Sequence, residues 1–179
     1  EGSEEMGRMV EPPHEIISLD DYRKRYALYR SDEDLQNLHA SKPMIVVWDD
    51  HEFTNNTWKN GAQNHSDNEG KFKDRIYNAI KSYYEWMPIR ENKNKLQIWR
   101  DFKVGNLFQL LMLDTRYLYR DKQLNINSYI NDGIINKEKY RKDLLKKRSL
   151  LGTEQQNWIR EKVSEKFKWS IFGQQLLIG

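Results

Sequence analysis

The residues best suited to chemistry stand in one run, Asp49-Asp50-His51-Glu52, which joins three carboxylates to an imidazole. Carboxylate oxygens suit hard divalent cations, and a histidine can bind metal or exchange a proton near neutral pH. Four such groups in succession are costly to pack unless metal ions or hydrogen bonds neutralise them, which favours a functional site. The alternative is that two of the acids cap a turn and the others stay solvated.

The segment before this run, Met44 to Trp48, is continuously apolar and rich in β-branched residues. This pattern predicts a strand buried on both faces of a sheet. The polar run would then lie at the carboxyl end of the strand, where α/β folds place binding and catalytic groups. The asparagine-rich stretch that follows, residues 53–65, predicts an active-site loop in which Asn55 and Asn56 either bind substrate or shape the backbone.

Arg116 is a second candidate, because it follows the apolar stretch 107–113 and the pair Asp114-Thr115. A guanidinium fork matches phosphate oxygens and could bind substrate. The commoner arrangement would be an ion pair with Asp114 that fixes the end of the strand. The remaining histidines are isolated from one another, so we expect structural or exposed positions for His14, His39 and His65.

The elements that must position these residues follow from periodicity and capping patterns. Helices are predicted at 18–30, 31–42 and 66–87, irregularly near 137–147, and from a cap at Thr153 and Gln156 to about 167. A β-hairpin around Gly105-Asn106 and a strand at 169–172 complete the pattern. Residues 120–150 suggest a polar surface excursion. This alternation predicts an α/β fold with a mixed β-sheet and flanking helices.

Composition excludes several classes of protein. The 179 residues carry 32% charged side chains that nearly balance at +3, so no strong nucleic-acid signal is present. The chain contains neither an apolar run long enough to span a bilayer nor an initial signal-peptide pattern. It also lacks cysteine, so any metal must be held by Asp, His, Asn, Glu or Tyr.

From about Leu19 to Gln175, the sequence resembles the PhoD-like alkaline phosphatases. Each fragment alone is weak, but the ordered set is specific. The motifs are Tyr22-Arg23, Tyr26-Ala27, Leu35-Gln36, His39-Ala40, Trp48 to Glu52, Asn55-Asn56, Trp58, Tyr84 to Pro88, Leu113 to Arg116, Arg120-Asp121, Gln123, Leu151-Gly152, Gln155, Trp158, Trp169 and Gly173 to Gln175.

The resemblance implies a partial metallophosphoesterase-type sandwich over residues 18–179, preceded by an extended arm or loop at 1–17. In the wider superfamily a strand ends in Gly-Asn-His-Glu, where the Asn binds metal and the His assists the leaving group. On that pattern Asp50 is the metal ligand and His51 the catalytic residue, with Asp49 as a weaker metal candidate and Glu52 as support for the loop. Two metal ions, iron and calcium, are implied.

The implied activity is hydrolysis of phosphodiesters, phosphomonoesters or both, by attack of a metal-bound hydroxide on phosphorus. The family's other metal ligands are expected outside this chain, which alone should carry only part of the site. Export to the periplasm or beyond is implied in the same way. Two alternatives stay open: a metal-free binding or structural protein on the same scaffold, and a carbohydrate or peptide hydrolase that uses Asp and Glu directly.

Overall fold

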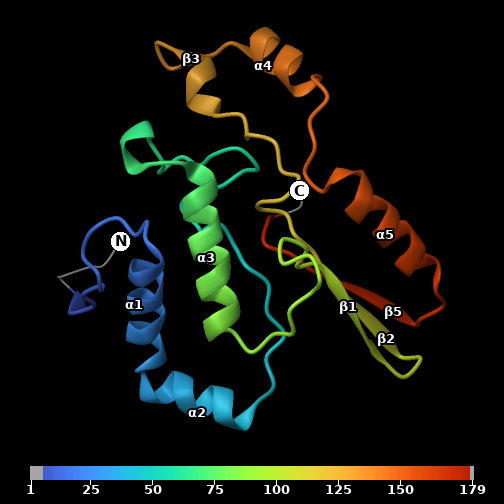
Figure 1. Ribbon diagram of the computed structural model, residues 1–179. Helices are drawn as coiled ribbons and strands as arrows, with labels where there is room; N and C mark the ends of the chain where they lie inside the picture. The colour runs from blue at the N-terminus through green and yellow to red at the C-terminus, as the bar shows by residue number, and fades with distance from the viewer. Residues whose placement is uncertain (1–5, 178–179) are drawn as a thin grey trace.

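The computed structural model describes residues 6–177 and shows a helical layer beside a small mixed sheet (Figure 1). The helices and strands are α1 (Leu19–Arg30), α2 (Glu33–Ser41), the 3₁₀ turn η2 (Asp67–Glu69), α3 (Phe72–Trp86), β1 (Arg100–Val104), β2 (Phe108–Met112), η3 (Ile126–Tyr129), β3 (Ile130–Asn131), β4 (Ile134–Ile135), α4 (Lys137–Leu144), α5 (Gly152–Ser164) and β5 (Trp169–Gly173). The α/β class and the mixed sheet are confirmed.

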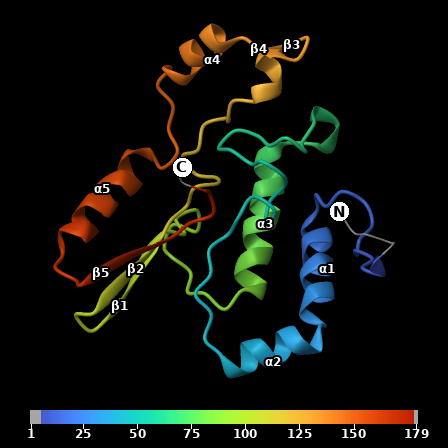
Figure 2. The same cartoon turned by 180° about the vertical axis from the view of Figure 1, so that it is seen from behind.

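Helices α1 and α3 pack side by side, and α2 runs across their lower end (Figures 1 and 2). α1 starts at the predicted capping box, in which Ser18 Oγ accepts a hydrogen bond from Asp21 N at 3.2 Å and Asp21 Oδ2 accepts one from Ser18 N at 2.9 Å. These reciprocal bonds satisfy two N–H groups that a helix start otherwise leaves open. The sequence therefore fixes where α1 begins.

The sheet has the strand order β1-β2-β5. β1 and β2 form the predicted antiparallel hairpin, with Arg100 opposite Met112, and β5 lies parallel to β2, with Phe108 opposite Trp169. α5 makes the crossover to β5 and is tied to the sheet where Gln109 Nε2 donates to the Lys162 carbonyl at 3.1 Å. β2 is the central strand of this sheet. Its end at Met112 leads directly into the turn that carries Arg116.

The main core lies between α1, α3 and the Trp48–Phe53 segment. Trp48 is fully buried and makes edge-to-face contacts with Phe53 and Tyr83, with ring centroids 5.2 and 5.5 Å apart. Tyr22 closes this core from α1, since its hydroxyl donates to the Phe53 carbonyl at 2.5 Å. The packing of Trp48 and Phe53 fixes both ends of the 49–52 run.

The predicted strand at 44–48 is wrong, because this segment pairs with no strand among residues 6–177. Met44 and Ile45 are exposed, and only Trp48 is buried. Two carbonyls of this segment accept hydrogen bonds from side chains instead of from a neighbouring strand. Arg100 donates to Val46 O, and Gln175 Nε2 donates to Trp48 O at 2.6 Å. A run of β-branched residues favours extended backbone, but only a pairing partner makes it a strand.

Three predicted helix starts shift by a few residues. Asp32, rather than Ser31, caps α2, since its Oδ1 accepts from Leu35 N at 2.8 Å. The Ser66 capping box closes only the 3₁₀ turn η2, and Gly70, at φ 86°, separates this turn from α3. α5 begins at Gly152, so Thr153 lies inside the helix rather than at its cap. Capping patterns mark the neighbourhood of a helix start better than its first residue.

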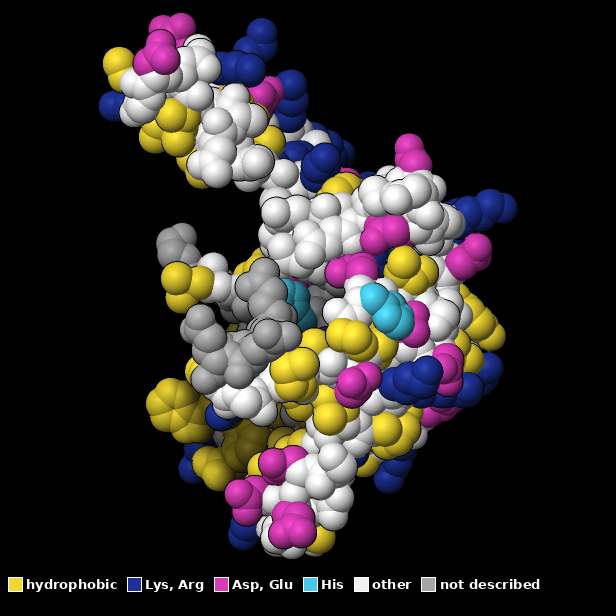
Figure 3. Space-filling model, turned by 90° about the vertical axis from the view of Figure 1, so that its left-hand side faces the viewer, with side chains coloured by type: hydrophobic (Ala, Val, Ile, Leu, Met, Phe, Trp, Pro, Cys, Tyr) yellow, Lys and Arg dark blue, Asp and Glu magenta, His cyan; other side chains and the backbone are white. Residues whose placement is uncertain are grey.

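The excursion at 120–150 projects from the rest of the surface, as Figure 3 shows, and carries η3, the β3–β4 ribbon and α4. Its largest buried side chain, Tyr129, packs edge-to-face on Tyr140 with centroids 5.2 Å apart. The polar surface character predicted for this region agrees with the exposure of most of its residues. Across residues 6–177, the helices all fall short of the length and apolar character that crossing a bilayer needs.

Candidate active site

The run at 49–52 forms a tight turn, here called the acidic turn, in which the Asp50 side chain is buried and oriented by a backbone donor. Phe53 N donates to the Asp50 carbonyl at 2.9 Å and closes the turn. The Asp50 carboxylate accepts a hydrogen bond from Asn56 N at 2.6 Å, and Asn56 adopts a left-handed backbone with φ 52°. Asn56 therefore contributes its backbone N–H, which holds one carboxylate oxygen of Asp50 in place.

Glu52 has the supporting role expected for it. Its Oε2 accepts a hydrogen bond from Asp49 N at 2.5 Å, on the inner side of the acidic turn. Burial raises the pKa of Glu52, and the hydrogen bond from Asp49 N only partly opposes that effect. Glu52 thus stabilises the turn from inside, while His51 is exposed and Asp49 is partly exposed.

Arg116 lies against the acidic turn and not against Asp114. Its Nε forms an ion pair with Asp49 Oδ1, and its Nη2 is 3.6 Å from Asp50 Oδ1. The predicted ion pair with Asp114 is wrong, because the backbone uses that carboxylate: Asp114 Oδ1 accepts from Arg116 N at 2.9 Å and from Tyr117 N at 3.0 Å. With Asp114 occupied as a turn cap, the guanidinium of Arg116 reaches the two acids of the other segment.

Arg120 is a second arginine at this place, which sequence reasoning noted only as part of a family motif. It is 8% exposed, and its Nη1 has no hydrogen-bond partner among the described residues. Burial and the neighbouring charge of Arg116 lower the pKa of Arg120, while Asp50 and Asp49 act in the opposite direction. The four-residue spacing of Arg116 and Arg120 in the turn region after β2 was the one signal in the sequence.

His51 is exposed on the outer side of the turn, and its neighbours in the loop fix its orientation. Gln63 Oε1 accepts from Asn55 Nδ2 at 3.2 Å and from Asn56 Nδ2 at 2.6 Å, which sets the orientation of both asparagine amides. Asn55 Oδ1 then faces His51 Nε2 at 3.2 Å. This contact engages Nε2 and leaves Nδ1 without a hydrogen-bond partner among the described residues.

Two glutamines join the segments that carry the site. Gln175 Nε2 donates to the carbonyls of Trp48 at 2.6 Å and Leu113 at 3.2 Å, so it holds the start of the acidic turn beside the end of β2. Gln155 is fully buried in α5 and makes two bonds to the Asp114 backbone: its Oε1 accepts from Asp114 N at 2.8 Å, and its Nε2 donates to Asp114 O at 2.9 Å. In the sequence, both glutamines are marked only by the family motifs that contain them.

The donor set fits a metal ion only in part. Asp50 offers an oriented carboxylate, and Asp49 lies beside it, but both face Arg116, which a cation would have to displace. Within residues 6–177, no group of three His, Asp or Glu side chains lies close enough to hold a metal. The described residues therefore do not complete a metal site, and the roles of Asp50 and Asp49 as ligands stay predictions.

Comparisons with known proteins agree with one another. The sequence model of the family described as PhoD-like phosphatase matches residues 1–179. Alkaline phosphatase D of Bacillus subtilis (strain 168) is 40% identical over 170 residues, which cover 92% of this chain and 28% of that protein. A solved structure of PhoD superposes with a TM-score of 0.74 at 36% identity, covering 93% of this chain and 31% of the other. The chain thus spans less than a third of these relatives.

Proposed function

Because this chain belongs to the PhoD-like phosphatase family, we propose that the protein hydrolyses phosphate esters and that the acidic turn forms part of its active site. The family assignment confirms the resemblance drawn from the ordered motifs. It also disfavours the reading as a carbohydrate or peptide hydrolase, which rested on the acidic residues alone. The relatives matched here bear the names alkaline phosphatase D and PhoD.

One observation carries this proposal at the level of geometry: Asp49, Asp50 and Arg116 come together from two distant segments, with His51 exposed beside them. A phosphate ester presents anionic oxygens that a guanidinium fork can hold. Arg116 would bind these oxygens by exchanging its contact with Asp49 for one with the phosphate. The buried charge of Arg120 behind it adds positive potential at the same place.

His51 is proposed to act on the leaving oxygen. Its Nε2 is tied to Asn55, so the proton passes through Nδ1, and the contact with Asn55 keeps the ring in one orientation. Asn55 and Asn56 shape the loop through their hydrogen bonds. We propose that these two residues also contact the substrate directly. Protonation of the leaving alcohol removes the need to expel an alkoxide, which is the usual gain from a general acid.

Metal dependence belongs to the proposal as well, with iron and calcium as the ions implied by family resemblance. Asp50 would supply one ligand, with Asp49 in support, and the ions would need further ligands besides these two. Such ions activate water and neutralise charge on the phosphoryl oxygens when they are bound. The residues of this chain contribute an oriented carboxylate, an arginine and a histidine on one surface.

The test is hydrolysis of p-nitrophenyl phosphate and bis(p-nitrophenyl) phosphate by the full-length protein, before and after chelation. We expect activity that chelation removes and that iron with calcium restores, and we expect Asp50→Asn to prevent restoration more severely than Asp49→Asn. A protein that binds phosphate but hydrolyses neither ester under any metal condition would instead be the metal-free binding protein. Activity that survives complete chelation would contradict the metal dependence alone.

A further inference from the structure

A cavity of about 690 Å³ opens beside His51, between the N-terminal segment and the asparagine-rich loop. We call it the arm pocket. Val10, Pro13 and Ile16 line it from the N-terminal segment, and His51, Phe53, Asn55 and Asn64 line it from the loop side. Its volume lies within the range of cavities that hold organic ligands and exceeds what a phosphate group alone would fill.

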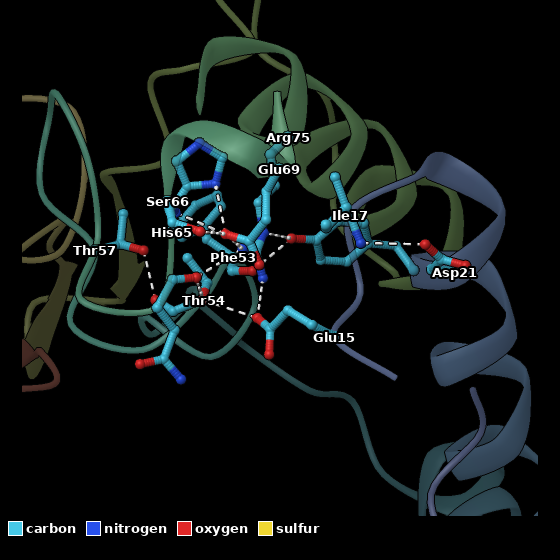
Figure 4. Close-up of polar contacts among 12 residues, drawn as sticks. Glu15, Ile17, Asp21, Phe53, Thr54, Thr57, His65, Ser66, Glu69 and Arg75 are labelled. Atoms are coloured by element: carbon cyan, nitrogen blue, oxygen red, sulfur yellow. Dashed lines mark hydrogen bonds and ion pairs between the residues drawn. The ribbon is translucent and has the colours of Figure 1, made fainter. Parts of the chain in front are cut away.

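The walls of the arm pocket are held by buried polar contacts, several of which Figure 4 shows. Arg75, 1% exposed, pairs with Glu15 of the N-terminal segment and donates to the Asn64 carbonyl of the loop at 2.7 Å. Thr54 Oγ1 also donates to the Asn64 carbonyl, at 3.0 Å. Arg75 therefore ties both walls to α3, so the cavity is formed before any ligand binds.

The charged side chains Arg25, His14 and Arg75 of the walls each have a polar partner in the protein. Arg25 donates from Nε to the Glu11 carbonyl at 3.0 Å and from Nη2 to the Pro12 carbonyl at 2.9 Å. His14 faces Asp21 at 3.2 Å, and Arg75 is paired with Glu15. Besides these groups, the lining offers apolar side chains, the amide of Asn64 and the ring of His51. This lining suits an uncharged organic group better than a second phosphate.

We propose that the arm pocket binds the organic alcohol portion of the substrate, which makes the protein selective for phosphate esters with a bulky leaving group. This inference rests on the proposed function. Hydrolysis forms a bond from a water oxygen to phosphorus, with loss of one water proton to the solvent, and breaks the bond from phosphorus to the alcohol oxygen, which departs with a proton. His51 lines the pocket and supplies that proton, so the departing alcohol lies on the pocket side of the histidine.

Two substitutions from opposite walls test the assignment. Val10→Trp fills the pocket from the N-terminal segment and Asn64→Trp fills it from the loop, while Met6→Trp places the same side chain on the N-terminal segment outside the lining. Release of inorganic phosphate from 1-naphthyl phosphate and from methyl phosphate is followed in the full-length protein. We expect each filling variant to raise KM for the naphthyl ester about tenfold and to change methyl phosphate less than about twofold. Met6→Trp should change neither.

Binding of 1-naphthol, followed by its fluorescence, separates this inference from the proposed function. We expect binding to the unmodified protein and to Met6→Trp, and binding about tenfold weaker in both filling variants. Absence of naphthol binding, or an equal loss for both esters in the filling variants, would overturn the assignment of the pocket. Naphthol binding that depends on Val10 and Asn64, in a protein that hydrolyses neither ester, would overturn the proposed function and support the pocket.

Discussion

The guanidinium of Arg116, in the turn after β2, forms an ion pair with Asp49 of the acidic turn. The Arg116 side chain is 12% exposed and the Asp49 side chain is 46% exposed, so the guanidinium is largely shielded from water while its carboxylate partner still reaches solvent. A buried arginine keeps its charge and demands anionic partners, which Asp49, Asp50 or a bound phosphate can supply. Through this contact Arg116, like Gln175, links the segment that carries His51 to the end of the central strand.

Replacing Arg116 should therefore damage catalysis more than folding. We expect Arg116→Ala to lower kcat/KM for a phosphate ester by about 10² to 10³, because one charged donor to the phosphoryl oxygens is lost. Arg116→Lys should recover only part of this loss, since a lysine lacks the planar fork. Steady-state kinetics of the full-length protein provide the measurement. Equal activity of the lysine variant and the unmodified protein would show that the fork itself has no role.

Gln155 should matter for stability because it satisfies both backbone groups of Asp114. Gln155→Leu leaves a buried N–H and a buried carbonyl without partners, and we expect the free energy of unfolding to fall by about 2–4 kcal/mol. Gln156→Leu, on the exposed neighbouring position of α5, is the matched control and should change it by less than about 0.5 kcal/mol. Urea unfolding of the two variants compares them directly, and similar losses would refute the role of Gln155.

The capping hydrogen bonds at the start of α1 should make the free energy of unfolding depend on pH in the acid range. Burial acts to raise the pKa of Asp21, but hydrogen bonds from the Ser18 and Ile17 N–H groups outweigh it and lower the value from 3.8 to about 2. A depressed pKa in the folded state stabilises the protein above the unfolded value, and this contribution disappears as pH falls through the folded value.

The stability advantage of the unmodified protein over Asp21→Asn should therefore be full above about pH 5 and should shrink between about pH 4 and 2. Urea unfolding at a series of pH values measures it. Asp20→Asn is a suitable control, because Asp20 is an exposed neighbour whose partner is Lys24 on the same helix. An advantage that stays constant down to pH 2 would show that the capping bonds do not depend on the charge of Asp21.

Local patterns predicted the parts of the fold that depend on near neighbours in sequence. The capping box at Ser18, the helix through Tyr83 and the hairpin around Gly105 all arise from contacts within a few residues. The segment 44–48 differs, because a strand exists only when a partner chain segment lies beside it. Its β-branched residues could not show that the side chains of Arg100 and Gln175 would bind its carbonyls.

The candidate site was predictable in its residue types and not in its pairings. Asp49, Asp50 and His51 could be recognised because they are consecutive in the sequence. Asn55, which contacts His51, follows it by only four residues. The partner of Arg116 was mistaken because Asp114 is near in sequence, whereas the structure assigns Asp114 to the backbone of its own turn. The spacing from Arg116 indicated Arg120 only weakly, because its burial depends on long-range packing, and the arm pocket depends on such packing entirely.

The proposed role of His51 gives the central claim its most direct measurement: hydrolysis of bis(p-nitrophenyl) phosphate by the full-length protein, compared between His51→Ala and His39→Ala. His39 lies on α2, away from the acidic turn, and controls for the loss of an imidazole. We predict that His51→Ala lowers kcat by about 10² to 10⁴, with both variants folded as judged by urea unfolding, and that His39→Ala stays within about twofold of the unmodified protein. Activity of His51→Ala within about threefold of the unmodified protein would contradict the proposed site.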